Sequence, residues 1–360
     1  MKICLVGLPL SGKSTLFSAL TGQAAAPAAV KGPEQVAVVK VPDDRIEVLN
    51  EIFKPRKKTP AAIEFTDIAG LAAGEPRAAG LSEQLLARLR AADALLFVVR
   101  AFGDPALPHP LGSVDPLRDL RALETEMLLA DLGIIEGRME KLAKQIAAKK
   151  SDRDVRELAA LGRCRERLES ETPLRWVDLA PDDEILLRGY RFLSQKPLIA
   201  AVNLGEGDAG READVLAPFA PWAEGPRSAV IGLSARLEME IRQLPPAEAR
   251  AFLADFGIDR PALDKLIATS FRLMGLASFF TVGSDEVKAW TIREGTRAAQ
   301  AAGVIHSDIE RGFIRAEVVP FEDFAACRTI AECRTAGALR LEGKDYPVRD
   351  GDIINFRFAV

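Results

Sequence analysis

Short apolar segments recur along the chain and are separated by longer stretches with helical character. They cover residues 2–6, 63–66, 94–99, 198–202 and 229–233. Their hydrophobicity is largely continuous rather than alternating, which favours strands buried on both faces. Parallel sheets covered by helices require such strands. The pattern therefore predicts an α/β core with a parallel-type sheet.

A charged helical stretch interrupts this core between residues 116 and 190. Its apolar residues alternate steps of four and three, as in a coiled-coil seam: Leu128, Leu132, Ile135, Met139, Leu142 and Ile146. After a polar turn near Ser151 a second set follows: Leu158, Leu161, Arg165 and Leu168. The spacing predicts an inserted antiparallel helical coiled-coil hairpin. Two ordinary core helices are the alternative.

The end of the chain has a different texture. A helical stretch over residues 262–276 precedes β-rich runs at 279–282, 287–292, 313–319 and 353–360. This predicts a small domain of mixed strands. We therefore expect three domains: a nucleotide-binding domain from residues 1–116 and 191–276, a helical domain from 117–190, and a C-terminal domain from 277–360.

Composition limits the classes of protein that the chain can belong to. With 360 residues, 48% of them hydrophobic, it is long enough for several cores, and no apolar run is long enough to span a bilayer. Its four cysteines lack CxxC spacing, which is typical of a reducing compartment. We expect a soluble, cytoplasmic protein without a membrane partner. A net charge of −4 argues against a wholly basic nucleic-acid binder and against sequence-specific DNA binding. The sequence leaves the oligomeric state open, with a monomer favoured.

The strongest motif is Gly7-Leu8-Pro9-Leu10-Ser11-Gly12-Lys13-Ser14, which matches the phosphate-binding loop GxxxxGK[ST]. A predicted strand precedes it and a helix follows, as this loop requires. Lys13 is expected to bridge the outer phosphates and the Ser14 hydroxyl to ligate Mg²⁺. The residues expected to bind the nucleotide here are Leu10, Ser11, Gly12, Lys13, Ser14 and Thr15. A glycine-rich turn without function is the alternative.

A second element, Asp67-Ile68-Ala69-Gly70, follows the strand at 63–66 directly. In this position Asp67 can hold the metal through water, and the Gly70 N–H can contact the γ-phosphate. Lys13 and Gly70 are therefore the catalytic candidates, and Ser14 and Asp67 the metal candidates. Leu71 stands where many GTPases carry the glutamine that orients water, and leucine cannot orient water.

The base-reading loop is expected at Asn203-Leu204-Gly205-Glu206, after the strand at 198–202. Guanine-specific proteins have Asn-Lys-x-Asp there, because the aspartate accepts hydrogen bonds from guanine N1–H and the 2-amino group. With Leu204 and Glu206 in those places, guanine selectivity becomes doubtful, although GTP stays possible. Adenine has no 2-amino group and an acceptor at N1, so a carboxylate there gains nothing with adenine either. Asn203 as a plain turn cap is the alternative. Ser234 and Ala235, after the next strand, fit the fifth nucleotide-contacting loop.

These motifs together resemble the YchF subfamily of Obg-like ATPases, which are P-loop proteins of the GTPase class. The resemblance covers nearly the whole chain and is most specific at residues 287–292, 299–306, 312–318 and 341–346. It implies a P-loop G domain, an inserted coiled-coil domain and a C-terminal β-grasp (TGS) domain. It also implies that ATP is preferred over GTP and is hydrolysed slowly with Mg²⁺, and that the partner is a ribosome or RNA.

Two departures from the family pattern bear on hydrolysis. The loop has Leu10 and Ser11 where the family usually has Asn and Val, and no threonine lies between Gly22 and Pro42 to complete the Mg²⁺ shell. A second hypothesis is therefore a non-hydrolysing ribosome- or RNA-binding module with a degenerate site. A small-molecule kinase is disfavoured by the loop at 203–206 and by the C-terminal domain.

The remaining polar groups suggest less specific roles. Two basic clusters can meet RNA phosphates or form solvated helix faces: Lys54, Arg56, Lys57 and Lys58, and, near the hairpin tip, Lys141, Lys144, Lys149, Lys150, Arg153 and Arg156. His109 is expected in a loop and His306 in a structural position. The sequence shows no His/Cys/carboxylate cluster that would favour zinc.

Overall fold

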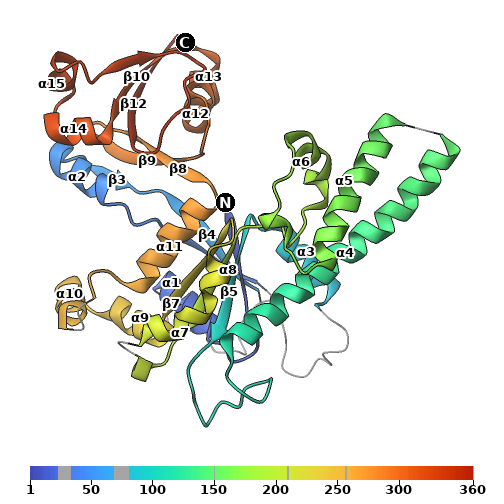
Figure 1. The fold of residues 1–360 in the computed structure, drawn as a ribbon. Helices are drawn as coiled ribbons and strands as arrows, with labels where there is room; N and C mark the ends of the chain where they lie inside the picture. Colours follow the sequence, from blue (N-terminus) through green and yellow to red (C-terminus); the bar gives the residue numbers. More distant parts are fainter. Residues whose placement is uncertain (23–33, 69–80, 150, 209–210, 256–257, 360) are drawn as a thin grey trace. The chain divides into compact units, whose positions relative to one another are not determined.

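The computed structural model describes residues 1–22, 34–68, 81–149, 151–208, 211–255 and 258–359 (Figure 1). Its contacts divide the chain into two units. The first contains Met1–Ala37 and Glu64–Leu266, and the second Val38–Ile63 and Ile267–Val360.

The sheet of the first unit has the order β2-β4-β1-β5-β6-β7. Its strands are β1 (Lys2–Val6), β2 (Glu34–Lys40), β4 (Ala62–Ile68), β5 (Ala94–Arg100), β6 (Leu198–Asn203) and β7 (Ser228–Leu233). The neighbouring strands from β4 through β1, β5 and β6 to β7 all pair in parallel. The five predicted strands and the parallel α/β core are confirmed, whereas the edge strand β2 was not predicted.

Helices of the first unit flank this sheet. They are α1 (Lys13–Thr21), α3 (Glu83–Ala91), α7 (Glu212–Leu216), α8 (Ala220–Ala223), α9 (Ala235–Gln243) and α10 (Pro246–Asp255). Helix α11 (Ala262–Leu273) begins in the first unit and ends in the second. Leu85 and Leu89 of α3 and Trp222 of α8 share one buried cluster with Phe97 of β5. On the phosphate-loop side α1 packs against α9. Strand β5 is buried along its whole length. The loops that follow the carboxyl ends of the strands are therefore attached to a well-packed core.

The predicted hairpin is formed by α4 (Pro116–Ala148) and α5 (Asp152–Glu169), which lie side by side and antiparallel (Figure 1). Asp115 caps α4, Pro116 opens its first turn, and Ser151 caps α5. The buried seam contains Leu128, Ile135, Leu142, Leu161, Cys164 and Leu168. One expected seam position was wrong: Arg165 is half-exposed and pairs with Glu169, and Cys164 is buried instead.

The base of the hairpin is tied to the sheet by a buried arginine. Arg175, in a short turn after α5, forms an ion pair with Glu124 of α4, and its Nε donates to Ser228 Oγ at 2.9 Å. Trp176 Nε1 donates to the same hydroxyl at 2.9 Å. Since Ser228 begins β7, the network joins α4 and the turn that follows α5 to an edge strand. Short turns Leu174–Trp176, Arg188–Tyr190 and Ala217–Phe219 and helix α6 (Pro181–Leu187) complete this region.

The second unit contains a mixed sheet in the order β11-β10-β12-β8-β9-β3. Its strands are β3 (Lys57–Thr59), β8 (Leu276–Thr281), β9 (Glu286–Arg293), β10 (Phe313–Pro320), β11 (Arg340–Glu342) and β12 (Asp352–Phe358). Its helices are α2 (Asp44–Phe53), α12 (Ala298–Ile305), α13 (Ser307–Arg311), α14 (Phe321–Cys327) and α15 (Ile330–Thr335). The predicted C-terminal β-rich runs are confirmed as strands.

Residues 38–63 group with this second sheet, although the sequence suggested that they belong with the first. The physical reason is strand pairing: β3 lies parallel to β9, and Thr59 Oγ1 donates to Glu286 at 2.6 Å. Arg45 of α2 also forms an ion pair of 2.7 Å with Asp350. The boundaries of three separate domains stay a prediction.

A search of the described ranges finds no helix that is long and apolar enough to cross a membrane.

One partly buried cation lies at the amino end of the first sheet. Lys196 Nζ donates to the carbonyls of Arg90, at 3.0 Å, and Ala92, which end α3 and precede β5. Burial lowers the pKa of this ammonium from its ordinary 10.5 to about 8. The folded chain therefore releases this proton at a lower pH than the unfolded chain does.

This difference predicts a pH-dependent stability. Between about pH 8 and pH 10 the unfolded state binds more protons at Lys196, so the free energy of unfolding of the wild type should rise relative to Lys196→Met by up to about 1 kcal/mol per pH unit. Urea titrations of both proteins across this range test it. A constant difference between the two proteins would contradict the assignment.

Candidate functional site

The segment from Gly7 to Ser14 forms a tight loop between β1 and α1. Leu10 and Gly12 have positive φ angles of 64° and 90°. A Cβ at Gly7 would lie 2.6 Å from the Val98 carbonyl oxygen, so only glycine fits there. The loop leads into α1, whose first residues are Lys13 and Ser14. Its turn and the N–H groups of the helix N-terminus can form a cradle for an anionic group.

A carboxylate lies beside the start of α1. Asp67, near the end of β4, is 5% exposed, and its Oδ2 accepts from Ser14 Oγ at 3.4 Å. Its Oδ1 has no hydrogen-bond partner among the described residues. A buried carboxylate oxygen without a partner, next to a hydroxyl, suits a hard cation or its bound water. The two predicted metal residues are therefore adjacent, and their chemistry fits Mg²⁺.

Asn203 connects three loops at this edge of the sheet. Its Nδ2 donates to the Ser11 carbonyl at 2.9 Å, and its Oδ1 accepts from Ala235 N at 3.0 Å. A Cβ at Gly12 would lie 2.0 Å from that Nδ2, so no residue other than glycine fits at this position of the loop. Asn203 is 4% exposed and is thus a link between loops rather than a simple turn cap.

The other residues predicted to contact the base differ in their surroundings. Leu204 is buried in the core cluster, and its N–H donates to the Leu233 carbonyl at 2.8 Å. The main chain of Glu206 begins a short turn, Glu206–Asp208. Asp208 Oδ2 accepts from Gly205 N at 2.9 Å, so this carboxylate holds the loop closed. Ser234 Oγ caps α9 by accepting from Leu237 N at 3.4 Å, which places the Ala235 N–H beside Asn203.

Several predicted features lie outside the described residues. They are Gly70, Leu71, Lys150 and the segment between residues 23 and 33, where the family pattern has its threonine. Their predicted roles stay predictions.

Phe102 is a site residue that the sequence did not reveal. A Cβ at Gly205 would lie 3.4 Å from Phe102 Cβ, and a Cβ at Gly12 would lie 3.9 Å from its ring carbon Cε1. The ring thus lies between the phosphate loop and the loop after β6. The one available signal was position: Phe102 follows β5, and the carboxyl ends of parallel strands share one edge.

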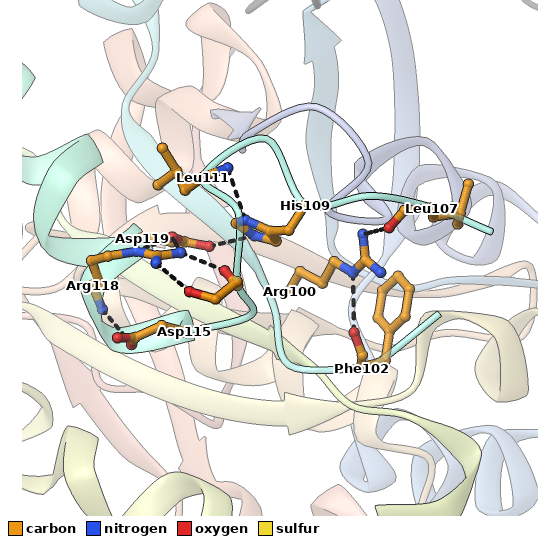
Figure 2. Close-up of polar contacts among 9 residues, drawn as sticks. Arg100, Phe102, Leu107, His109, Leu111, Asp115, Arg118 and Asp119 are labelled. Atoms are coloured by element: carbon orange, nitrogen blue, oxygen red, sulfur yellow. Dashed lines mark hydrogen bonds and ion pairs between the residues drawn. The ribbon is translucent and has the colours of Figure 1, made fainter. Parts of the chain in front are cut away.

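Loop 101–115, which carries Phe102, is held by polar contacts at both ends (Figure 2). Arg100 donates to carbonyls of the loop at one end. At the other end His109 Nε2 lies 2.9 Å from Asp119 of α4, while its Nδ1 accepts from Leu111 N at 3.1 Å. His109 is a loop residue as predicted, and its side chain is a buried anchor.

The first predicted basic cluster is largely neutralised by acidic partners. The pairs are Lys58 with Glu47 at 2.5 Å, Lys57 with Glu286 at 3.0 Å and Arg56 with Asp285 at 3.6 Å. At the hairpin tip Lys141, Lys144, Lys149, Arg153 and Arg156 are exposed. The tip is therefore the better of the two candidates for contact with phosphates.

Two family models match the chain. The model described as "50S ribosome-binding GTPase" matches residues 2–130. The model of the YchF-GTPase C-terminal domain, described as a protein of unknown function (DUF933), matches residues 276–359. The two matches fall on the phosphate-loop part and on the C-terminal part of the chain.

Relatives match over almost the full length. The chain is 42% identical to the Bacillus subtilis "Ribosome-binding ATPase YchF", covering 99% of this chain and 98% of that protein. It is 38% identical to Xenopus laevis "Obg-like ATPase 1", covering 99% and 92%. A solved structure of the Schizosaccharomyces pombe YchF GTPase superposes with a TM-score of 0.88 at 34% identity, covering 99% and 97% of the two chains.

The phosphate loop also contains a buried hydroxyl group that should lower the stability of the fold. Ser11 is 2% exposed, and its Oγ has no hydrogen-bond partner among the described residues. Because a buried hydroxyl without a partner is destabilising, Ser11→Ala should raise the free energy of unfolding by about 1 kcal/mol. Urea denaturation measures the change.

Ser228→Ala is the matched control, because this buried serine uses its hydroxyl in several hydrogen bonds. The same substitution there should lower the free energy of unfolding by about 2 kcal/mol. If both variants lose stability to a similar extent, the Ser11 hydroxyl has a partner after all.

Proposed function

The chain belongs to the family of YchF and Obg-like ATPases, and we propose that it binds ATP with Mg²⁺ at residues 7–14 and hydrolyses it slowly in association with the ribosome. The single observation that carries the proposal is the Asn203 link. It ties the phosphate loop after β1, at Ser11, to the loop after β7, at Ala235, and so brings together loops from the carboxyl ends of β1, β6 and β7.

The phosphate end of the site has defined roles for its residues. The N–H groups from Ser11 to Thr15 cradle the β-phosphate, and Lys13 stabilises the charge of the outer phosphates. Ser14 and Asp67 would hold Mg²⁺, which when bound neutralises charge on the phosphate oxygens. Gly70 would offer its N–H to the γ-phosphate.

The base end supports ATP over GTP. Guanine would need a carboxylate acceptor for N1–H and the 2-amino group, and Asp208, the nearest described aspartate of the loop, is already bound to Gly205 N. Leu204 is buried and offers no polar group. Phe102 offers a ring between the two loops, which suits stacking on a purine.

Slow turnover follows from the lack of an assigned general base. Leu71 replaces the glutamine of many GTPases, so the attacking water would be placed by backbone groups or by the substrate phosphate. The alternative is a ribosome-binding module that does not hydrolyse ATP.

Association with the ribosome is supported by the names of the relatives and by the exposed basic side chains at the hairpin tip. Cations of this kind can neutralise RNA phosphates in a salt-dependent manner. The chain as a whole is acidic, so the contact would be regional.

A hydrolysis assay with and without ribosomes tests the proposal, beside titrations with ATP and GTP. The wild type should bind ATP more tightly than GTP, and Lys13→Ala should lower ATP hydrolysis at least about a hundredfold, since it removes a charge that stabilises the transferring phosphoryl group.

ATP binding and ribosome binding without hydrolysis under any condition would favour the non-hydrolysing module. Tight GTP binding with negligible ATP binding would overturn the assignment of the base.

A further inference from the structure

A buried arginine lies at the carboxyl end of β5, directly before the site. Arg100 is 2% exposed. Its guanidinium donates from Nε to the Phe102 carbonyl at 3.0 Å and from one terminal nitrogen to Leu107 O at 2.8 Å (Figure 2). The other terminal nitrogen donates to Asp104 O at 3.4 Å. The Arg100 side chain thus binds three backbone carbonyls of the segment 102–107 and fixes its conformation.

Hydrophobic packing alone does not account for a cation in this place. No carboxylate among the described residues lies within ion-pair distance of Arg100, so its charge is met by carbonyl oxygens. Burying a guanidinium without an acidic partner is costly, and an apolar side chain would fill the volume without that penalty. The arginine instead provides a planar fork with donors in fixed directions.

The same guanidinium also fixes the ring of Phe102. Its Cζ lies 4.5 Å from the ring centroid, which is a close cation–π contact. Main chain and ring of Phe102 are therefore both held by Arg100. The ring so held lies beside Gly12 of the phosphate loop, and the Phe102 Cβ lies beside Gly205 of the loop after β6.

We propose that Arg100 is a positioning residue for nucleotide recognition: it holds the Phe102 ring in the orientation that stacks on the purine base. This inference rests on the proposed function, because it assigns a determinant of base binding within the same site. Arg100 itself touches neither base nor phosphate. Arg100 should therefore contribute to the affinity for a ligand that has a purine base and not to the affinity for a ligand that lacks one.

The experiment compares two ligands by calorimetry in Mg²⁺ buffer: ATP, and inorganic tripolyphosphate, which occupies the phosphate loop but has no base. Arg100→Lys keeps the charge but loses the fork and the planar contact, and Phe102→Leu keeps an apolar side chain but loses the ring. Each should weaken ATP binding by about tenfold, since stacking of a base on an aromatic ring has at least that value, and leave tripolyphosphate binding within about twofold.

A matched control separates positioning from general destabilisation. Lys196→Met removes a partly buried cation that also donates to backbone carbonyls, at the opposite end of the same sheet, and should change neither affinity.

Each outcome decides the question. ATP affinity lost with tripolyphosphate affinity retained supports the inference. Equal loss for both ligands, or wild-type ATP affinity in Arg100→Lys, overturns it and leaves the proposed function standing. A wild-type protein that binds tripolyphosphate but not ATP overturns the proposed function and this inference together.

Discussion

The side-chain amide of Asn203 is the interaction on which the arrangement of this site depends. Both of its ends are used, one on the Ser11 carbonyl and the other on the Ala235 N–H, and the group is almost fully buried. In a low-dielectric interior such bonds are strong, and loss of the amide would leave two buried backbone groups without partners. The close approach also explains Gly12, since any Cβ there would meet the amide nitrogen.

This link holds a loop whose own sequence is unfavourable. Leu10 is in a left-handed conformation at φ 64°, which costs about 1–2 kcal/mol for a residue with a Cβ, and its side chain is 46% exposed. The hydroxyl of Ser11 is buried without a described partner. Neither residue favours the loop locally, so its shape is maintained by the surrounding contacts, Asn203 above all. A site can in this way keep its geometry while its local residues drift from the pattern of the family.

Sequence patterns predicted those parts of the molecule that depend on local periodicity. The five buried strands and the hairpin follow from apolar runs and seam spacing, and the phosphate loop and Asp67 follow from motifs with fixed neighbours. Strand β2 was missed because it alternates at a sheet edge, with Val36 and Val38 exposed. Strand β3 is three residues long and polar, and only its pairing with β9 makes it a strand. Arg165 was misplaced because a strict seam spacing drifts around a real helix, which brings Cys164 inward. Phe102 and Arg100 belong to no motif, and their roles arise from which loops meet at one edge.

Two physical connections run from the helical hairpin to the edge of the sheet that carries the site. Arg175 binds Glu124 of α4 and Ser228 of β7, and β7 leads directly to Ser234 and Ala235, where Asn203 attaches. His109 binds Asp119 in the first turn of α4 and closes the loop that begins at Arg100 and Phe102. Both connections are buried and polar, so their geometry is more specific than that of an apolar contact. A hairpin attached only by apolar packing could shift by small steps. A hairpin attached by these two networks must either keep its orientation at the base or break a buried hydrogen bond, and each alternative affects a loop of the candidate site.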